Sequence, residues 1–183
     1  MITRTTVRAA QCRALQMLDQ AGIALTPAEI AQIEVADFGL DDLERIGLEL
    51  VVYVNTDRYC AKELILFPGQ TCPEHRHPDG PNGRGKMETF RVRRGTVYLG
   101  VPGAPTRPGQ ARVPAGAEPY FTVRHEIVLH PGDQYTLPPN TLHWFQAGPA
   151  GAIVSEFSST SCDEADIFTD PRIRRLPEVD ETR

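Results

Sequence analysis

The sequence predicts a mainly β protein, an antiparallel sandwich or barrel that follows a small group of N-terminal helices. Two observations carry this prediction. The period of the apolar residues changes from near 3.6 to 2 at Leu48, and Gly–Pro turn signals separate the short β-branched and aromatic runs beyond it. The predicted strands lie at 50–54, 64–67, 96–99, 126–129 and 152–154. Many short strands with frequent turns are typical of antiparallel sandwiches and barrels.

The N-terminal region has helical signals. Apolar residues between Val7 and Leu18 follow helical spacing and predict a first helix. Residues 26–29 supply an N-cap threonine, a proline and a capping-box glutamate, so we predict a second helix running toward Val35. Residues 41–44 are a candidate start for a short third helix.

The chain therefore divides into two parts that we expect to form a single structural unit. Residues 1–47 are a helical cap, and residues 48–183 are a barrel with a polar C-terminal tail. The segment 102–119 is rich in Gly, Pro and Ala, which predicts a long surface loop.

Composition excludes several classes of partner. The 183 residues carry a net charge of −5, which argues against nucleic-acid binding. No apolar run approaches the roughly 18 residues of a membrane span, and the N-terminus lacks a secretory signal. The four cysteines form no C-x-x-C pair, so we expect reduced thiols in a cytoplasmic protein. Of 19 basic residues only Lys62 and Lys86 are lysines.

Candidate metal ligands cluster in the middle of the chain. In a strand, alternate side chains share a face, so His75 and His77 would project the same way, about 6.6 Å apart along it. Glu88 lies on the segment that follows, and His143 lies at the start of a later strand. Three imidazoles and one carboxylate leave about two positions open on a six-coordinate ion, which suits Mn²⁺ or Fe²⁺ and admits Zn²⁺ or Co²⁺.

Other residues near this cluster are expected to take no part in it. Glu74 and Arg76 alternate out of phase with the two histidines, and the phase of Cys72 also directs it away. His125 and His130 have no partner at ligand spacing and are expected to be structural.

The spacing of these residues resembles two motifs of the cupin superfamily. Gly69 to His77 and Glu88 to Gly95 match the first motif, except that ten residues separate His77 from Glu88 where three or four are usual. Gly132 to His143 matches the second motif. The resemblance implies a cupin fold, a double-stranded β-helix or jelly-roll barrel, with His75, His77, Glu88 and His143 as its metal ligands.

A closer resemblance, over roughly residues 50 to 175, is to the cupin D-lyxose isomerases. It is carried by residues 69–78, 85–99, 155–161 and 163–168. The resemblance implies a Mn²⁺-dependent aldose–ketose isomerase that acts on free sugars. It would interconvert D-lyxose with D-xylulose and D-mannose with D-fructose. The resemblance also implies a homodimer.

Isomerisation moves a hydrogen between C1 and C2, which requires a base. Glu156 is the candidate catalytic base because it interrupts an otherwise apolar strand, where an unpaired carboxylate is costly. Glu88 is a second candidate catalytic group, a role that the resemblance allows for a metal ligand. Lys86 shares the face of Glu88 in an extended strand and is expected to act in catalysis and to hold sugar oxygens.

Four further residues are candidates for sugar binding. Lys62 precedes a predicted strand, and the resemblance directs it into the site. Asp166 is a candidate to close over the sugar from the tail, and a solvated capping stretch is the alternative. Trp144 and Phe90 are candidates for an apolar wall, and packing in the β-core is the simpler explanation of both aromatics.

Three other functions remain open on sequence alone. An Fe-dependent cupin dioxygenase also needs open coordination sites, and a non-catalytic sugar-binding cupin would need no base. A cupin phosphosugar isomerase would need a phosphate site, for which Arg91, Arg93 and Arg94 form the dense basic group.

Overall fold

The computed structural model describes residues 2–80, 83–176 and 179–180. Two helices lie near the N-terminus, and two strands, β6 and β9, are much longer than the others. In chain order the elements are β1 (Ile2–Thr3), α1 (Arg4–Gln20), α2 (Pro27–Ala31), β2 (Glu34–Ala36), β3 (Leu48–Asn55), β4 (Cys60–Leu66), β5 (Thr71–Arg76), β6 (Glu88–Val101), η1 (Glu118–Tyr120), β7 (His125–Leu129), β8 (Gln134–Leu137), β9 (His143–Ser158), η2 (Asp163–Ala165), β10 (Ile167–Phe168) and β11 (Val179–Asp180).

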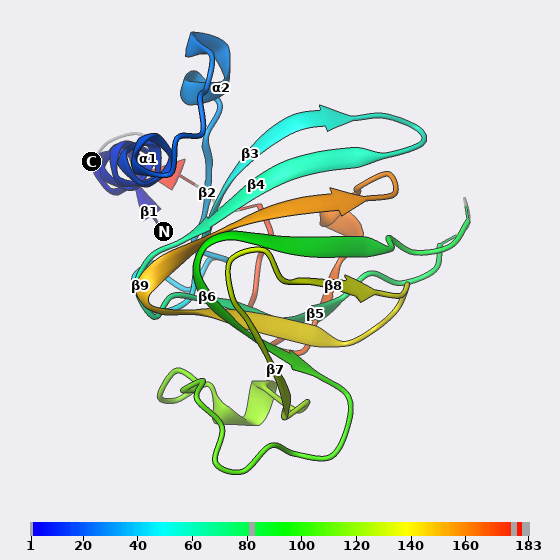
Figure 1. Cartoon of the computed structure of the whole chain (residues 1–183). Coiled ribbons are helices and arrows are strands. Elements are labelled where there is room, and N and C mark those ends of the chain that lie inside the picture. The colour runs from blue at the N-terminus through cyan, green and yellow to red at the C-terminus, as the bar shows by residue number, and fades with distance from the viewer. Residues whose placement is uncertain (1, 81–82, 177–178, 181–183) are drawn as a thin grey trace.

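The long strands β6 and β9 pass through both layers of the barrel (Figure 1). The beginning of β6 and the end of β9 pair with β8 and β4, and β3 and β2 continue this first layer. The end of β6 and the beginning of β9 pair with β7 and β5, and β10 completes the second layer. The result is a curled antiparallel barrel, as the sequence predicts.

Glycines occupy the corner where both long strands bend. The β6–β9 register shifts on either side of Gly95, which has a φ of 76°. A Cβ atom on Gly95 would lie 1.9 Å from the carbonyl oxygen of Gly151. No other residue fits so close an approach at a positive φ, so glycine permits the bend that closes the barrel.

Two apolar clusters stabilise this arrangement. One fills the space between the layers and includes Leu50, Leu64 and Phe90 from the first layer with Leu99 and Phe145 from the second. Each such side chain contributes about 1.5–3 kcal/mol when fully buried. The other cluster lies beneath α1, whose Ala14 and Leu18 pack on the outer side of the first layer.

The N-terminal region differs from the prediction in two places. The second helix ends at Ala31, and residues 34–36 form β2 at the edge of the first layer. Residues 41–44 form turns, not a third helix. In both places the sheet edge and its core contacts override local helical signals. The predicted loop at 102–119 is confirmed, with a single turn of 3₁₀-helix at its end.

No helix in residues 2–80, 83–176 and 179–180 is long and apolar enough to cross a bilayer.

Candidate metal centre and active site

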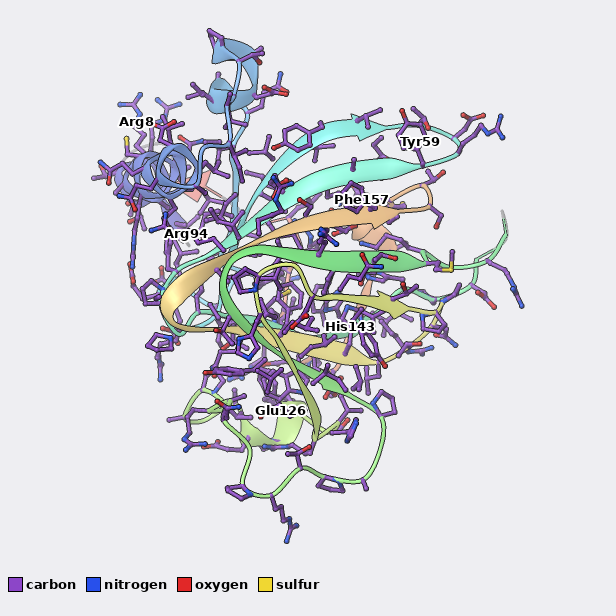
Figure 2. All side chains as sticks on the ribbon, in the orientation of Figure 1. Arg8, Tyr59, Arg94, Glu126, His143 and Phe157 are labelled. Carbon is purple, nitrogen blue, oxygen red and sulfur yellow. The ribbon has the colours of Figure 1, made fainter. Side chains whose placement is uncertain are left out.

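Three buried histidines converge between the two layers of the barrel, and His143 is labelled in Figure 2. His75 lies near the end of β5, His77 follows that strand, and His143 begins β9. The backbone pairs His75 directly with His143. One ring nitrogen from each histidine lies within 4.8 Å of the other two, which is a spacing that a single metal ion can bridge.

The outer nitrogen of each imidazole is held by an oxygen. The Nδ1 atom of His75 lies 2.8 Å from the carbonyl oxygen of Pro73, and the Nδ1 atom of His143 lies 2.9 Å from that of Thr141. A carbonyl only accepts, so both Nδ1 atoms must carry hydrogen. The Nδ1 atom of His77 lies 2.5 Å from a carboxylate oxygen of Asp166. Each Nε2 atom is thereby directed inward, as in histidine metal sites.

Glu88, at the start of β6, faces these inward nitrogens from the opposite layer. Its Oε1 atom lies 3.2 Å from Nε2 of His77 and 2.9 Å from Nε2 of His143. The buried Nε2 atom of His143 nevertheless has no hydrogen-bond partner. In its neutral form this nitrogen and the carboxylate oxygen both present lone pairs, so they need a shared cation. The four side chains therefore fit a divalent metal with mixed nitrogen and oxygen ligands.

The pKa values of the clustered side chains also indicate that this site favours a bound cation. Burial and the neighbouring imidazoles lower the pKa of His75 well below its usual value, so its ring stays neutral. Burial on its own would also lower the pKa of His77, but the carboxylates of Glu88 and Asp166 outweigh it and raise the value to about 9. Burial would raise the pKa of Glu88, yet Lys86 and His77 hold it well below its usual range.

Lys86 and Glu156 form an ion pair next to Glu88. The Nζ atom of Lys86 lies 2.7 Å from Glu88 and 3.0 Å from Glu156. All three side chains are less than a tenth exposed. The two carboxylates raise the pKa of Lys86 well above its usual value although burial opposes this, so the amine stays charged. One buried ammonium thus joins a candidate metal ligand to the candidate base.

Lys62 also faces this cavity, but its ammonium group has other partners. Its Nζ atom lies 2.9 Å from Oγ of Ser161 and 2.8 Å from a carboxylate oxygen of Asp163. Arg175 binds the same carboxylate and also Glu34 of β2. Burial would raise the pKa of Asp163, but these cations hold it far below its usual range. The contacts favour a role for Lys62 in fastening the tail over a direct role in holding sugar.

The tail forms one wall of the site. Strand β10 pairs with β5 at Arg76 and His75, and the ring of Phe168 stacks on that of His75 with centroids 5.3 Å apart. Immediately before this strand, Asp166 binds His77. The structure therefore brings Asp166 to the site, where it contacts a candidate metal ligand.

The two predicted wall aromatics lie in different places. Phe90 lines the cavity and packs on His143 and Phe145. Trp144 lies on the opposite side of β9 from His143, where it packs edge-to-face against Phe121 and its Nε1 donates to the carbonyl oxygen of Val123. The structure does not bring Trp144 to the cavity, because successive side chains of a strand face opposite ways.

A bulge in β5 corrects the prediction for Cys72. The β5–β9 register shifts between Cys72 and His75, so one extra residue reverses the phase and Cys72 lines the cavity. Its thiol is not among the clustered ligand atoms, and burial raises its pKa well above the usual value. Glu74 faces away, as expected, and its carboxylate accepts hydrogen bonds from Thr122 and Thr169.

The remaining sequence candidates lie apart from the cavity. Arg91 contacts Gln134, and Arg94 contacts Met17 and Gln20 of α1, so the basic group faces the outside of the first layer. His125 and His130 lie outside the histidine cluster. Sequence analysis missed Asp163 and Arg175 as cavity residues, since their contacts with Lys62 and β2 arise only through tertiary structure.

A curled jelly-roll barrel with converging imidazoles and a carboxylate between its layers defines a cupin with a candidate metal centre. The sequence profile of the D-lyxose isomerase family matches residues 104–183. The chain is 62% identical over 181 residues to the D-lyxose/D-mannose isomerase of Thermosediminibacter oceani, covering 99% of this chain and 100% of that protein. It is 63% identical over 173 residues to the D-lyxose ketol-isomerase of Cohnella laeviribosi, covering 94% and 95%. The chain therefore belongs to the D-lyxose isomerase family and is an aldose–ketose isomerase.

Solved structures share the fold at lower identity. The L-ribose isomerase of Cellulomonas parahominis without ligand superposes with a TM-score of 0.81, at 18% identity and with 98% of each chain covered. The L-ribose isomerase of Acinetobacter sp. DL28, in complex with L-ribose, also gives a TM-score of 0.81, at 17% identity and with 98% of each chain covered. At this level of identity the comparison supports the barrel and its N-terminal helices.

Proposed function

We propose that this chain interconverts D-lyxose with D-xylulose and D-mannose with D-fructose, with Mn²⁺ as the metal and Zn²⁺, Co²⁺ or Fe²⁺ as alternatives. One observation carries the proposal: the buried Lys86–Glu156 pair lies directly beside the cluster of His75, His77, His143 and Glu88. A base next to a candidate Lewis-acid site is what aldose–ketose isomerisation requires. The names of the relatives at 62% and 63% identity support the choice of sugars.

The residues of this chain divide the reaction between them. His75, His77, His143 and Glu88 would hold the metal, which supplies Lewis-acid polarisation of the sugar oxygens when bound. Glu156 takes the proton from C2 of the aldose as that C–H bond breaks, and returns it to C1. A second proton moves from the C2 hydroxyl to the C1 oxygen. Glu88 is the second candidate for carrying protons, because Lys86 connects it to Glu156.

Lys86 has two tasks in this proposal. Its ammonium holds the Glu156 carboxylate 3.0 Å away and so fixes the position of the base. The same charge stabilises negative charge that develops on a sugar oxygen in a cavity with little water. Phe90 and Phe168 supply apolar surface for the carbon face of the sugar and keep water out.

The test is a panel of metals against a panel of sugars. Protein stripped with a chelator is reloaded with Mn²⁺, Co²⁺, Zn²⁺ or Fe²⁺ and incubated with D-lyxose or D-mannose, and the ketose is measured. The proposal expects metal-dependent D-xylulose and D-fructose. Absence of ketose with every metal would refute it, and oxygen uptake would favour the dioxygenase alternative. Deuterium from solvent in the product would indicate proton transfer through an enediol, not a hydride shift.

We also propose a homodimer in the cytoplasm. On the outer side of the first layer, Phe157 (Figure 2) is 52% exposed. Tyr53 of β3 is 40% exposed. Apolar side chains of this size on one sheet face suit an interface. Sedimentation of the wild type and of Phe157→Glu tests this, since the variant should shift toward monomer. The helical cap and the barrel are proposed to act as one unit, supported by the packing of α1 on the first layer.

A further inference from the structure

The free space beside the candidate metal ligands is too small for a sugar. This cavity, lined by His75, Glu88 and Glu156 among others, has a volume of about 30 Å³. Such a volume admits about two ordered water molecules. A pentose has five carbons and five oxygens, so its reacting end can enter here while its other carbons must lie elsewhere.

A second cavity continues from the first. Its volume is about 570 Å³, and His77, Lys86 and Asp166 line both cavities. We call it the vestibule. Its other walls come from the tip of the β3–β4 hairpin, from the segment between His77 and Glu88, and from the residues after β9. These segments all lie at the end of the barrel opposite α1 (Figure 1). A sugar whose reacting carbons lie beside Lys86 therefore extends into the vestibule.

The unusual ten-residue segment between His77 and Glu88 forms part of this wall. It folds back on the metal strand at Gly85, where a Cβ atom would lie 2.1 Å from the carbonyl oxygen of His77. The amide of Gly85 donates to Asp79, and Met87 exchanges hydrogen bonds with Ser159 at the end of β9. The end of the segment is thus tied to the chain just after β9, and Gly85 packs against the backbone of His77. Its described residues, including Gly80 and Arg84, therefore form one wall of the vestibule.

The opposite wall offers polar groups for hydroxyls. Thr56 orders the hairpin tip by accepting hydrogen bonds from the amides of Arg58 and Tyr59. Asp57 and Arg58 line the vestibule, and their charged groups make no hydrogen bond or ion pair with the residues that the structure describes. Thr160 lines the same space from the end of β9. A few convergent polar groups of this kind recognise a polyol by hydrogen bonding.

We propose that the vestibule is the subsite for the distal carbons of the sugar and sets the preference between pentoses and hexoses, with Arg58 and Thr160 as its specificity-determining residues. This inference rests on the proposed function. D-mannose has the C2–C4 configuration of D-lyxose and one further carbon with its hydroxyl. The additional group therefore lies in the vestibule, while the reacting carbons of both sugars occupy the same place.

The experiment compares the two sugars in Arg58→Ala and Thr160→Val. Loss of one hydrogen bond to the distal end should lower the ratio of kcat/KM for D-mannose to that for D-lyxose by about fivefold, mostly through KM. The affinity for Mn²⁺ and the Tm should stay at the wild-type values, because neither side chain contacts the metal cluster. The matched control is Arg91→Ala, an exposed arginine on the outer side of the first layer.

Two outcomes separate this inference from the proposed function. A wild type that isomerises both sugars, with an unchanged ratio in both variants, would overturn the subsite alone. If the wild type isomerises neither sugar, calorimetric binding of D-mannose and D-lyxose to Mn²⁺-loaded protein replaces kinetics. A binding ratio lowered in Arg58→Ala and Thr160→Val, but not in Arg91→Ala, would then support the subsite while the proposed reaction fails. An unchanged binding ratio would refute both.

Discussion

The two layers of the barrel contribute different chemistry to the same cavity. The second layer supplies the imidazoles of His75 and His143, and each is oriented by a carbonyl two residues earlier in the chain. The first layer supplies Lys62 and Glu156, and each is held by a partner far away, 101 and 70 residues respectively. The imidazoles of His75 and His143 are thus oriented locally, whereas His77, held by Asp166, and the half proposed to move protons depend on tertiary contacts. Substitutions in the two halves should therefore fail in different ways.

The largest effect is expected from a ligand in the second layer. His143→Ala removes one of three converging nitrogens and should lower metal affinity by more than about a hundredfold, the upper range for losing a partner that only orients a ligand. Isomerase activity should fall to background. Calorimetric Mn²⁺ titration and a ketose assay measure both quantities.

The control for that variant is His130→Ala, the same substitution at a histidine outside the cluster. Chelation of the wild type should reproduce the loss of activity, and added Mn²⁺ should restore it. Retention of full metal affinity in His143→Ala would contradict the ligand set.

The first layer should show the opposite pattern. Glu156→Gln keeps the shape of the side chain, and its amide oxygen still accepts from Lys86, but the base is lost. We expect kcat to fall by about 10²–10⁴-fold with little change in metal affinity. Single-turnover kinetics and Mn²⁺ titration test this together. A variant that loses metal and activity in parallel would show that the two halves are not separable.

A variant of Asp166 tests the connection between the tail and the second layer. Asp166→Asn keeps an acceptor for Nδ1 of His77 but removes the charge. Metal affinity should weaken by about tenfold, and activity should recover at saturating Mn²⁺ with an unchanged KM for sugar. A raised KM at saturating metal would instead support the sugar-binding role that the sequence suggested. Asp166→Ala, which removes the acceptor as well, should weaken metal binding further.

The effect expected outside the cavity is on stability, at the buried carboxyl of Glu49 in the first layer. Burial raises the pKa of Glu49 to about 8, against a hydrogen bond from Gln70 and the more distant Arg13. In the unfolded chain the Glu49 carboxyl ionises near its ordinary pKa of 4.5. The free energy of unfolding is therefore highest below that pH and falls as the pH rises toward 8. We expect a loss of about 4–5 kcal/mol in the wild type and a flatter profile in Glu49→Gln. Thermal unfolding between pH 5 and 9 measures it, and identical profiles would contradict the expectation.

The contrast between the layers also explains what sequence could predict. His75, His77, Glu88 and His143 were identifiable because strand alternation and motif spacing are local properties. Cys72 was misplaced because the bulge in β5 depends on its pairing with β9.

The contacts of the first layer could not be predicted from the sequence either, because they too depend on tertiary structure. The carboxylate that binds Lys62 belongs to Asp163 in the tail, 101 residues away. No local sequence pattern predicts that these two residues pair. Trp144 shows the converse, since its position next to His143 in a strand already directs it to the opposite face. The β2 strand at 34–36 likewise replaced a predicted helical turn through pairing with β3.

Because the chain contains two lysines and the side chains of both are less than a tenth exposed in the cavity, lysine chemistry becomes a selective reporter of this site. Reductive ¹³C-methylation under native conditions would leave Lys62 and Lys86 shielded, and denaturation would expose them together. If the two lysines are labelled with ¹³C-methyl groups, each should give its own NMR signal. Lys62 would report on its contact with Asp163, and Lys86 on its contacts with Glu88 and Glu156. The signals of Lys62 and Lys86 would thus report the binding of sugar and of metal.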